Sequence, residues 1–219
     1  MTEASRARAE ILADIRSANR RSAALPPADE TWETLPRAYR QTGALSPADC
    51  IELLAERLRD YGAGVVLVAP HQVADAIADI LRRRNQSSVL VAPDVDPAWL
   101  NSAECSWVRD RPLSYEALSG VDGVLTGCTA AIAATGTLCL CHSDSSQGRR
   151  APTLIPDYHL CVVRAGQIVE NVPQGMRALE PYRNQPITLI SGPSATADIE
   201  MTRIQGVHGP RTLDVAIVV

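Results

Sequence analysis

The chain has 219 residues, within the range of one large α/β domain, and 46% of them are apolar, which is enough to bury a continuous core. The formal net charge of −4 provides no basic field for neutralising phosphates, so we expect no nucleic-acid partner. No apolar run approaches the roughly 20 residues that cross a bilayer, and no apolar signal segment opens the chain. We therefore expect a soluble, cytoplasmic protein without a membrane span.

Six cysteines occur, at positions 50, 105, 128, 139, 141 and 161, and no two of them have C-x-x-C spacing. Zinc and iron–sulfur sites usually show that spacing, because two thiolates must converge on one centre. Cys139 and Cys141 would share one face of a strand, with His142 on the other face, so a metal would need distant ligands. We predict reduced, buried, structural cysteines and no metal site.

The N-terminal region, residues 1–46, is predicted to be a helix and a linker arm that precede an α/β domain at residues 47–219. Apolar side chains recur at helical spacing from Ala4 to Ile15, which indicates a peripheral helix over residues 1–22. Acidic residues in this stretch argue against a transit peptide. Residues 23–45 contain three prolines and little periodicity, which favours a linker.

The first long element after the arm is a helix beginning at Ser46-Pro47-Ala48-Asp49. This tetrapeptide combines an N-cap hydroxyl, a proline at the first helical position and a carboxylate near the positive helix end. Gly62 can take the left-handed conformation that ends the helix. Short apolar runs at 65–68 and 88–92 flank a helical segment at 71–84, which predicts two parallel strands buried on both faces in a right-handed βαβ unit.

The rest of the chain is less regular. Asp96-Pro97 opens another predicted helix. Further strands are predicted at residues 121–125, 137–141, 158–163, 187–190 and 213–219. Few long helices separate these strands, so we expect antiparallel pairs or a hairpin at the edge of the parallel sheet. The predicted fold class is α/β, with a mostly parallel sheet, helices on both faces and an antiparallel edge.

The first candidate site is the small-residue segment from Gly127 to Thr137. Thr135, Gly136 and Thr137 offer amides and hydroxyls that could cradle an anionic group, since small residues let a ligand approach the backbone. The alternative is a tight turn in a packed core, because Gly and Thr are ordinary turn residues.

The second candidate is Ser191 to Asp198, where the strand ending at Ile190 is predicted to give way to a helix. Free helical amides at such a strand end attract carboxylates and phosphates, and Gly192, Ser194 and Thr196 suit that role. The alternative is that Ser194 or Thr196 only caps the helix.

Two further segments are candidates for binding or catalysis. His208 lies in a glycine-bracketed turn, where an imidazole can bind an anion or act as a base, although a structural hydrogen bond is the alternative. Gly148, with Arg149 and Arg150, lies in a polar loop that could close over a carboxylate, because a guanidinium matches a carboxylate's two oxygens. A solvated hairpin tip is the alternative for that loop.

Three sequence blocks resemble the LUD domain (lactate utilisation protein C) family. They read TGCTAAIAATGTLCL, IPDYHLCVV, and SGPSATADIE with GVHGP, and the resemblance covers roughly residues 60–219. It implies a fold like that of sugar-phosphate isomerases, CoA transferases and formyltetrahydrofolate cyclo-ligases. It also implies a role in oxidising L-lactate to pyruvate with two iron–sulfur partner proteins, so that this chain carries no cofactor itself. Family members usually have an acidic residue where this chain has Ala134.

Three functions follow as hypotheses. The leading one is a subunit of an L-lactate utilisation system that binds a small carboxylate or phosphate at a crevice formed by Thr135–Thr137, Gly192–Asp198 and His208. A stand-alone enzyme acting on a sugar phosphate, an acyl-CoA or a folate is the second. A non-catalytic ligand-binding or scaffold protein is the third. Whether the chain is itself an enzyme stays open at this point.

Overall fold

The computed structural model describes residues 3–18, 34–143, 146–197, 203–205 and 209–219. The chain divides into two compact units, residues 1–39 and 40–219. The first unit contains helix α1 (Glu3–Ala18), which confirms the predicted N-terminal helix, and its Ile11 and Ile15 side chains are exposed. In the part of the chain that is described, no helix has both the length and the apolar character needed to span a membrane.

At the start of the second unit, the residues before α3 (Pro47–Asp60) contact one buried carboxylate. Glu170, 5% exposed, accepts hydrogen bonds from the backbone amides of Ala44 and Leu45 and forms an ion pair with Arg40. The segment from Arg40 onward is therefore held against the domain.

Six of the described strands form one parallel sheet in the order β1-β12-β7-β4-β2-β3. Their bounds are β1 (Gly64–Val68), β2 (Ser88–Val91), β3 (Ser106–Arg109), β4 (Gly123–Thr126), β7 (Tyr158–Arg164) and β12 (Thr212–Val218). Every neighbouring pair runs parallel, which confirms the predicted parallel α/β sheet. The prediction that β1 is buried on both faces is wrong: β1 pairs only with β12 at the sheet edge, and Leu67 is 48% exposed.

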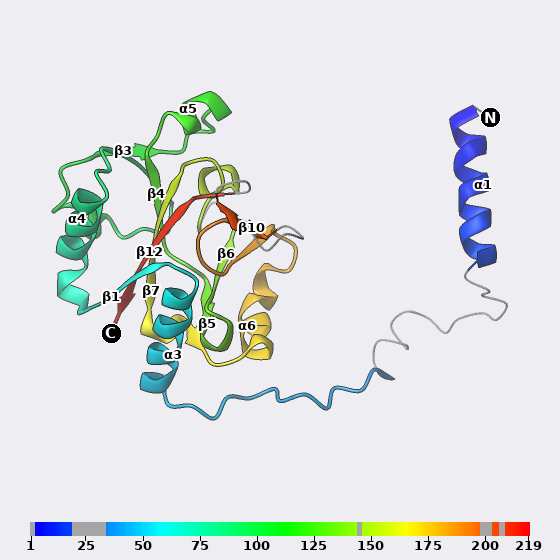
Figure 1. The fold of residues 1–219 in the computed structure, drawn as a ribbon, viewed down its shortest axis with the longest axis horizontal. Coiled ribbons are helices and arrows are strands. Elements are labelled where there is room, and N and C mark those ends of the chain that lie inside the picture. Colours follow the sequence, from blue (N-terminus) through cyan, green and yellow to red (C-terminus); the bar gives the residue numbers. More distant parts are fainter. Residues whose placement is uncertain (1–2, 19–33, 144–145, 198–202, 206–208) are drawn as a thin grey trace. The chain divides into compact units, whose positions relative to one another are not determined.

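Helices cover both faces of this sheet, as predicted (Figure 1). Helix α3 (Pro47–Asp60) begins with the predicted Ser46 cap, whose hydroxyl accepts from the Asp49 amide, and it buries Leu54 and Leu58 on one face. Helix α4 (Val73–Arg83) packs on the opposite face through apolar side chains that include Ile77. The short helix α5 (Tyr115–Ser119) covers the α3 side near β2 and β4 through Leu118.

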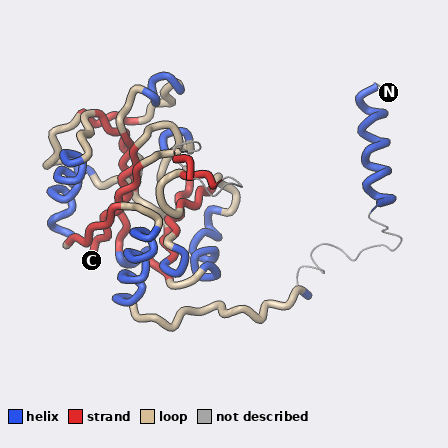
Figure 2. The backbone as a smooth tube through the Cα atoms, in the orientation of Figure 1, coloured by secondary structure: helices blue, strands red, loops and turns tan. Residues whose placement is uncertain are grey.

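The antiparallel strands form a second sheet. Its order is β8-β5-β6-β9, with bounds β5 (Ala130–Ile132), β6 (Thr137–Cys141), β8 (Ile168–Val169) and β9 (Ile187–Ile190). The antiparallel pairs β5–β6 and β6–β9 thus occur as expected, but they pack on a face of the six-stranded sheet and do not extend its edge (Figure 2). The reason is that both faces of β6 are apolar: Leu138 and Leu140 face the first sheet, and Cys139 and Cys141 lie with Leu179 of helix α6 (Val172–Leu179).

Two predicted helices are wrong. The segment opened by Asp96 is a single 3-10 turn, Pro97–Leu100, and the segment after Ile190 forms strand β10 (Ala195–Ala197). Strand β10 pairs antiparallel with β11 (Arg203–Gln205), so its backbone is part of a two-stranded sheet. Local propensity does not explain this strand, because only Thr196 is β-branched and alanine is uncommon in strands, so the pairing with β11 decides it. Within the described residues 191–197 no helix begins.

One charged network ties helix α4 to the starts of β7 and β12. Arg84 donates to both carboxylate oxygens of Asp214 at 2.7 Å, and the Tyr158 hydroxyl donates to Asp214 at 2.9 Å. Asp214 is 6% exposed, whereas the Arg84 side chain is 43% exposed. Burial, with Asp214 adding to it, raises the pKa of the Tyr158 phenol, so this group stays protonated as a donor.

We expect Asp214→Asn to lower the free energy of unfolding by about 2 kcal/mol, because the amide cannot accept all three of these hydrogen bonds. The half-exposed arginine keeps the loss below that of a fully buried pair. Urea denaturation measures the change. As a control, Asp157→Asn removes an exposed carboxylate that is 3.5 Å from Arg211 and should cost about 0.5 kcal/mol or less. Equal losses in the two variants would contradict this account.

Candidate functional site

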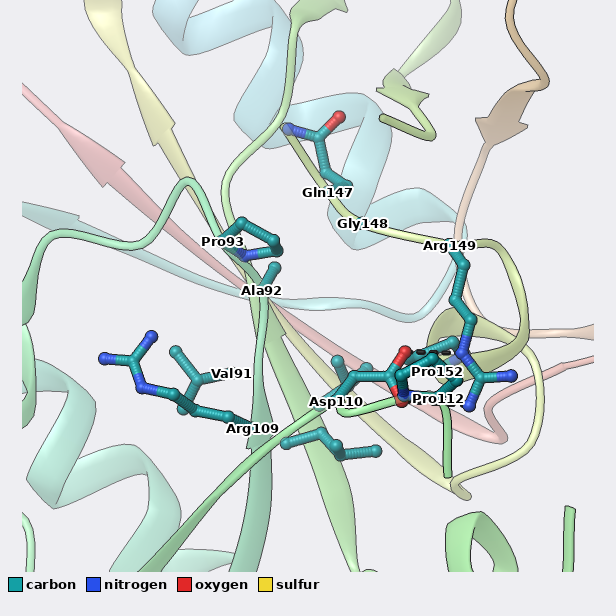
Figure 3. Close-up of a pocket in the computed structure, with 12 residues that line it drawn as sticks. Val91, Ala92, Pro93, Arg109, Asp110, Pro112, Gln147, Gly148, Arg149 and Pro152 are labelled. Carbon is teal, nitrogen blue, oxygen red and sulfur yellow. Dashed lines mark hydrogen bonds and ion pairs between the residues drawn. The ribbon is translucent and has the colours of Figure 1, made fainter. Parts of the chain in front are cut away.

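The predicted site residues that the structure describes fall near two separate cavities. The first cavity, of about 250 Å³, lies at the carboxyl ends of β2 and β3 and is lined mainly by apolar side chains, with Arg149 at its rim (Figure 3). Arg149 is held there by Asp110, with nitrogen–oxygen distances of 2.5 and 2.9 Å, and by the Leu113 carbonyl at 2.6 Å. The same guanidinium lowers the pKa of the Asp110 carboxyl. The structure therefore uses Arg149 to anchor its loop on the end of β3.

The second cavity, of about 320 Å³, contains two of the predicted residues, Gly192 and Ser194. We call it the serine cavity. It is lined by Arg150, Thr153, Leu154, His159, Thr188, Leu189, Ile190, Ser191, Gly192, Pro193, Ser194, Ala195, Gly209, Pro210 and Leu213. These residues come from the end of β9, the turn before β12, the start of β7 and the loop before β7.

The loop after β9 is shaped by its contacts with α3 and with the turn before β12. Gly192 has φ +88°, and a Cβ atom there would lie 2.5 Å from the Tyr61 Cβ, so only glycine fits without displacement. The Ser194 amide donates to the Pro210 carbonyl at 2.9 Å. Two segments that the sequence placed at one crevice, Gly192–Ser194 and the Gly209–Pro210 turn, thus lie together.

The segment Thr135–Thr137, at the start of β6, does not line the serine cavity but contacts one of its lining residues. Thr135 Oγ1 and Thr137 Oγ1 are 2.7 Å apart, and Thr137 Oγ1 is 2.8 Å from Ser191 Oγ, which does line the cavity. Gly136 has φ +59° and packs against Arg57 of α3, where a Cβ would collide. The segment supports the cavity wall through this chain of hydroxyls.

Arg150, which the sequence suggested together with Arg149 as a carboxylate-binding side chain, is the cation that lines the serine cavity. The turn Ala151–Thr153 fixes its backbone, because the Thr153 amide and hydroxyl both donate to the Arg150 carbonyl, at 3.1 and 2.9 Å. The neighbouring Arg149 lies at the other cavity. The sequence shows two adjacent arginines, but it does not say which of them reaches which cavity.

His159 lies inside β7 and lines the serine cavity from below. It is 1% exposed, and its Nε2 is 2.8 Å from Thr126 Oγ1. Burial lowers its pKa from 6.5 to about 4, so the imidazole is neutral near pH 7. The sequence predicted a hydrogen-bonded core imidazole, and the Nε2 contact agrees with that prediction. The position of His159 at a cavity was decided by tertiary packing.

His142 follows β6 and contacts the same cavity through Thr188. Its Nε2 is 2.8 Å from Thr188 Oγ1, and its Nδ1 is 3.2 Å from the Gly148 carbonyl oxygen. Burial is the main cause of its lowered pKa, and the positive charge of Arg150 lowers it further. The expectation that His142 points away from Cys139 and Cys141 is confirmed by its partners.

Other predicted residues lie outside what can be described. His208 and Asp198 are outside the described residues, and of Thr196 only the backbone, in β10, is described. The six cysteines are free thiols, and all except Cys105 are buried. Burial raises the pKa of the Cys139 thiol to about 11, so it stays protonated. Among the described residues, no group of three or more His, Cys, Asp or Glu side chains could hold a metal ion.

The serine cavity suits a small anion. Its lining includes one arginine, Arg150, and the hydroxyl-bearing residues Ser191 and Ser194, and no acidic side chain is among the described residues that line it. A guanidinium and hydroxyl donors are the groups that proteins place around carboxylates. The first cavity differs because a carboxylate, Asp110, is among its lining residues and pairs with Arg149, while Arg109 is an exposed second arginine there.

Comparisons with known proteins give a consistent result. A family model described as LUD domain matches residues 51–218. The chain is 42% identical over 188 residues to lactate utilization protein C of Deinococcus radiodurans, across 85% of this chain and 87% of that protein. It is 26% identical over 191 residues to lactate utilization protein C of Macrococcus caseolyticus, across 82% and 81%. The crystal structure of a DUF162 family protein from Deinococcus radiodurans superposes with a TM-score of 0.68 at 38% identity, over 80% of this chain and 100% of that one.

The depressed pKa of His159 predicts acid sensitivity. In the unfolded chain the imidazole binds a proton near pH 6.5, whereas in the fold it does so only near pH 4. The free energy of unfolding therefore has its full value above about pH 6.5. It decreases by about 3 kcal/mol in total as the pH falls toward 4. We expect His159→Gln to flatten the fall in unfolding free energy between these limits, measured by urea titrations at a series of pH values. His71→Gln, at an exposed position, should leave the fall unchanged, and a His159→Gln profile parallel to the parent would refute the assignment.

Proposed function

This chain belongs to the LUD domain family, and on that premise we propose that it acts in lactate utilisation as one subunit of an L-lactate-oxidising system in the cytoplasm. Relatives named lactate utilization protein C, matched over more than four-fifths of their lengths, support this role. The proposal concerns a subunit that recognises the small carboxylate on which the system acts.

We place the carboxylate in the serine cavity. The observation that carries this choice is the position of Arg150, whose backbone is fixed by Thr153 and which lines a cavity that also has serine residues and no acidic side chain among its described lining residues. A guanidinium can donate two parallel hydrogen bonds to a carboxylate, and such charge-assisted bonds are about twice as strong as neutral ones. Ser191 and Ser194 supply hydroxyls on the facing loop.

We place the electron-transferring iron–sulfur clusters in partner proteins. In this chain Cys50, Cys128 and Cys161 are packed among the apolar side chains between α3 and the two sheets, and Cys139 and Cys141 are packed beside α6. Those thiols serve as core side chains. A division of labour in which this subunit binds the carboxylate and its partners move the electrons agrees with that packing.

Arg150→Ala tests the ligand site. We expect the parent protein to bind L-lactate or pyruvate in calorimetric titrations, and the variant to bind about tenfold to a hundredfold more weakly, because one charge-assisted contact is lost. Arg183→Ala is the matched control: Arg183 is exposed and pairs with Glu180 on the surface, so its removal should not change the affinity. Unchanged affinity of Arg150→Ala for these ligands would contradict the placement of the carboxylate in the serine cavity.

The subunit role has its own test. We expect the tagged chain, expressed in its own organism, to co-purify with iron–sulfur proteins, and its deletion to slow growth on lactate but not on glucose. Normal growth of the deletion strain on lactate, together with purification of the chain alone, would reject the role.

A further inference from the structure

One hydroxyl of the serine cavity has a fixed hydrogen-bonding direction. Thr188 lines the cavity from strand β9 and is partly exposed, and its Oγ1 is 2.8 Å from Nε2 of His142. His142 is held beside it by the backbone, because the His142 amide donates to the Pro186 carbonyl at 2.9 Å and so extends the pairing of β6 with β9. The pair is therefore built on a sheet, which keeps its geometry rigid.

The other ring nitrogen decides which atom carries the proton. Nδ1 of His142 is 3.2 Å from the carbonyl oxygen of Gly148, and a carbonyl can only accept. Nδ1 must therefore carry a hydrogen. Burial lowers the pKa of His142, so near neutral pH the ring has one hydrogen only and Nε2 is a bare acceptor.

The Thr188 hydroxyl then has to donate to Nε2. A hydroxyl has a single hydrogen, and once this is committed to His142 the oxygen presents only lone pairs to the cavity. A ligand group that meets Thr188 must be a donor. A carbonyl oxygen at the same place would face the threonine oxygen without a hydrogen between them, and a buried acceptor without a donor costs affinity.

From this geometry we propose that Thr188 and His142 form a specificity-determining pair, which makes the cavity favour a carboxylate bearing a neighbouring hydroxyl over the corresponding carbonyl compound. The inference rests on the proposed function in one respect, that the serine cavity binds a small carboxylate. It adds which residues distinguish a 2-hydroxy acid from a 2-oxo acid. Thr188 and His142 act by hydrogen-bond polarity, with Arg150 holding the carboxylate of either ligand.

Paired titrations test the proposal. The two ligand pairs are L-lactate with pyruvate and 2-hydroxybutyrate with 2-oxobutyrate. In each pair the first member has a hydroxyl where the second has a carbonyl. We expect the parent protein to bind the hydroxy acid about three- to tenfold more tightly in each pair, as one neutral hydrogen bond allows. Thr188→Val should abolish the preference by weakening the binding of the hydroxy acid alone, whereas Thr188→Ser, which keeps the hydroxyl, should retain the preference. Thr42→Val, an exposed threonine outside both cavities, is the matched control and should keep the full preference.

A spectroscopic measurement checks the premise without any ligand. Long-range ¹H–¹⁵N correlation spectra of the folded protein at pH 7.5 should show His142, identified by loss of its signals in His142→Gln, as the neutral tautomer with hydrogen on Nδ1. Hydrogen on Nε2 would overturn the proposal. Equal affinity of the parent protein for both members of each pair would also overturn the proposal. If Arg150→Ala still weakened binding of both members in that case, the proposed carboxylate site would stand. Binding of neither member to the parent protein overturns the proposed site and the specificity pair together.

Discussion

The apolar layer shared by the two sheets is the constraint on which the rest of the domain depends. Leu138 and Leu140 of the second sheet pack against Val163 and Val215 of the first, and α3 closes the same layer with Leu54. Because this layer must be buried, β9 is brought over the starts of β7 and β12. The serine cavity lies at that overlap, so its hydroxyls and imidazoles are positioned by core packing.

Helix α3 positions the loops around the cavity as well as the core. Gly136 packs on Arg57 of α3 and Gly192 on Tyr61, the residue that caps the end of this helix, and each glycine has a positive φ. The hydroxyl chain from Thr135 to Ser191 joins the two loops between these contacts. A ligand in the cavity would thus meet a wall whose backbone is already fixed, which lowers the entropy lost on binding.

Two buried imidazoles at one cavity have different surroundings. His159 lies deep in β7 with Thr126, whereas His142 lies between a backbone carbonyl and a hydroxyl that reaches the cavity. Both are neutral near pH 7 because burial disfavours the charged ring. Arg150 is therefore the cation that a carboxylate would meet at this cavity, and the imidazoles set hydrogen-bond polarity around it.

Local sequence determined the capped start of α3 and the apolar segments that became parallel strands, because capping and apolar runs are properties of residues close together in the chain. It did not determine burial at every position, since β1 is exposed at Leu67 and Cys105 is only partly buried. Gly192 and Ser194, which the sequence suggested as ligand-binding residues, line the serine cavity, and their binding of a ligand stays a prediction. Tertiary structure alone decided that residues 195–197 pair as a strand, that the antiparallel strands stack on a sheet face, and that Arg149 binds Asp110 while Arg150 lines the serine cavity. These outcomes required partners distant in the sequence, such as Gln205 for Ala195, Asp110 for Arg149 and Ile190 for Leu138, and local periodicity carries no information about such contacts.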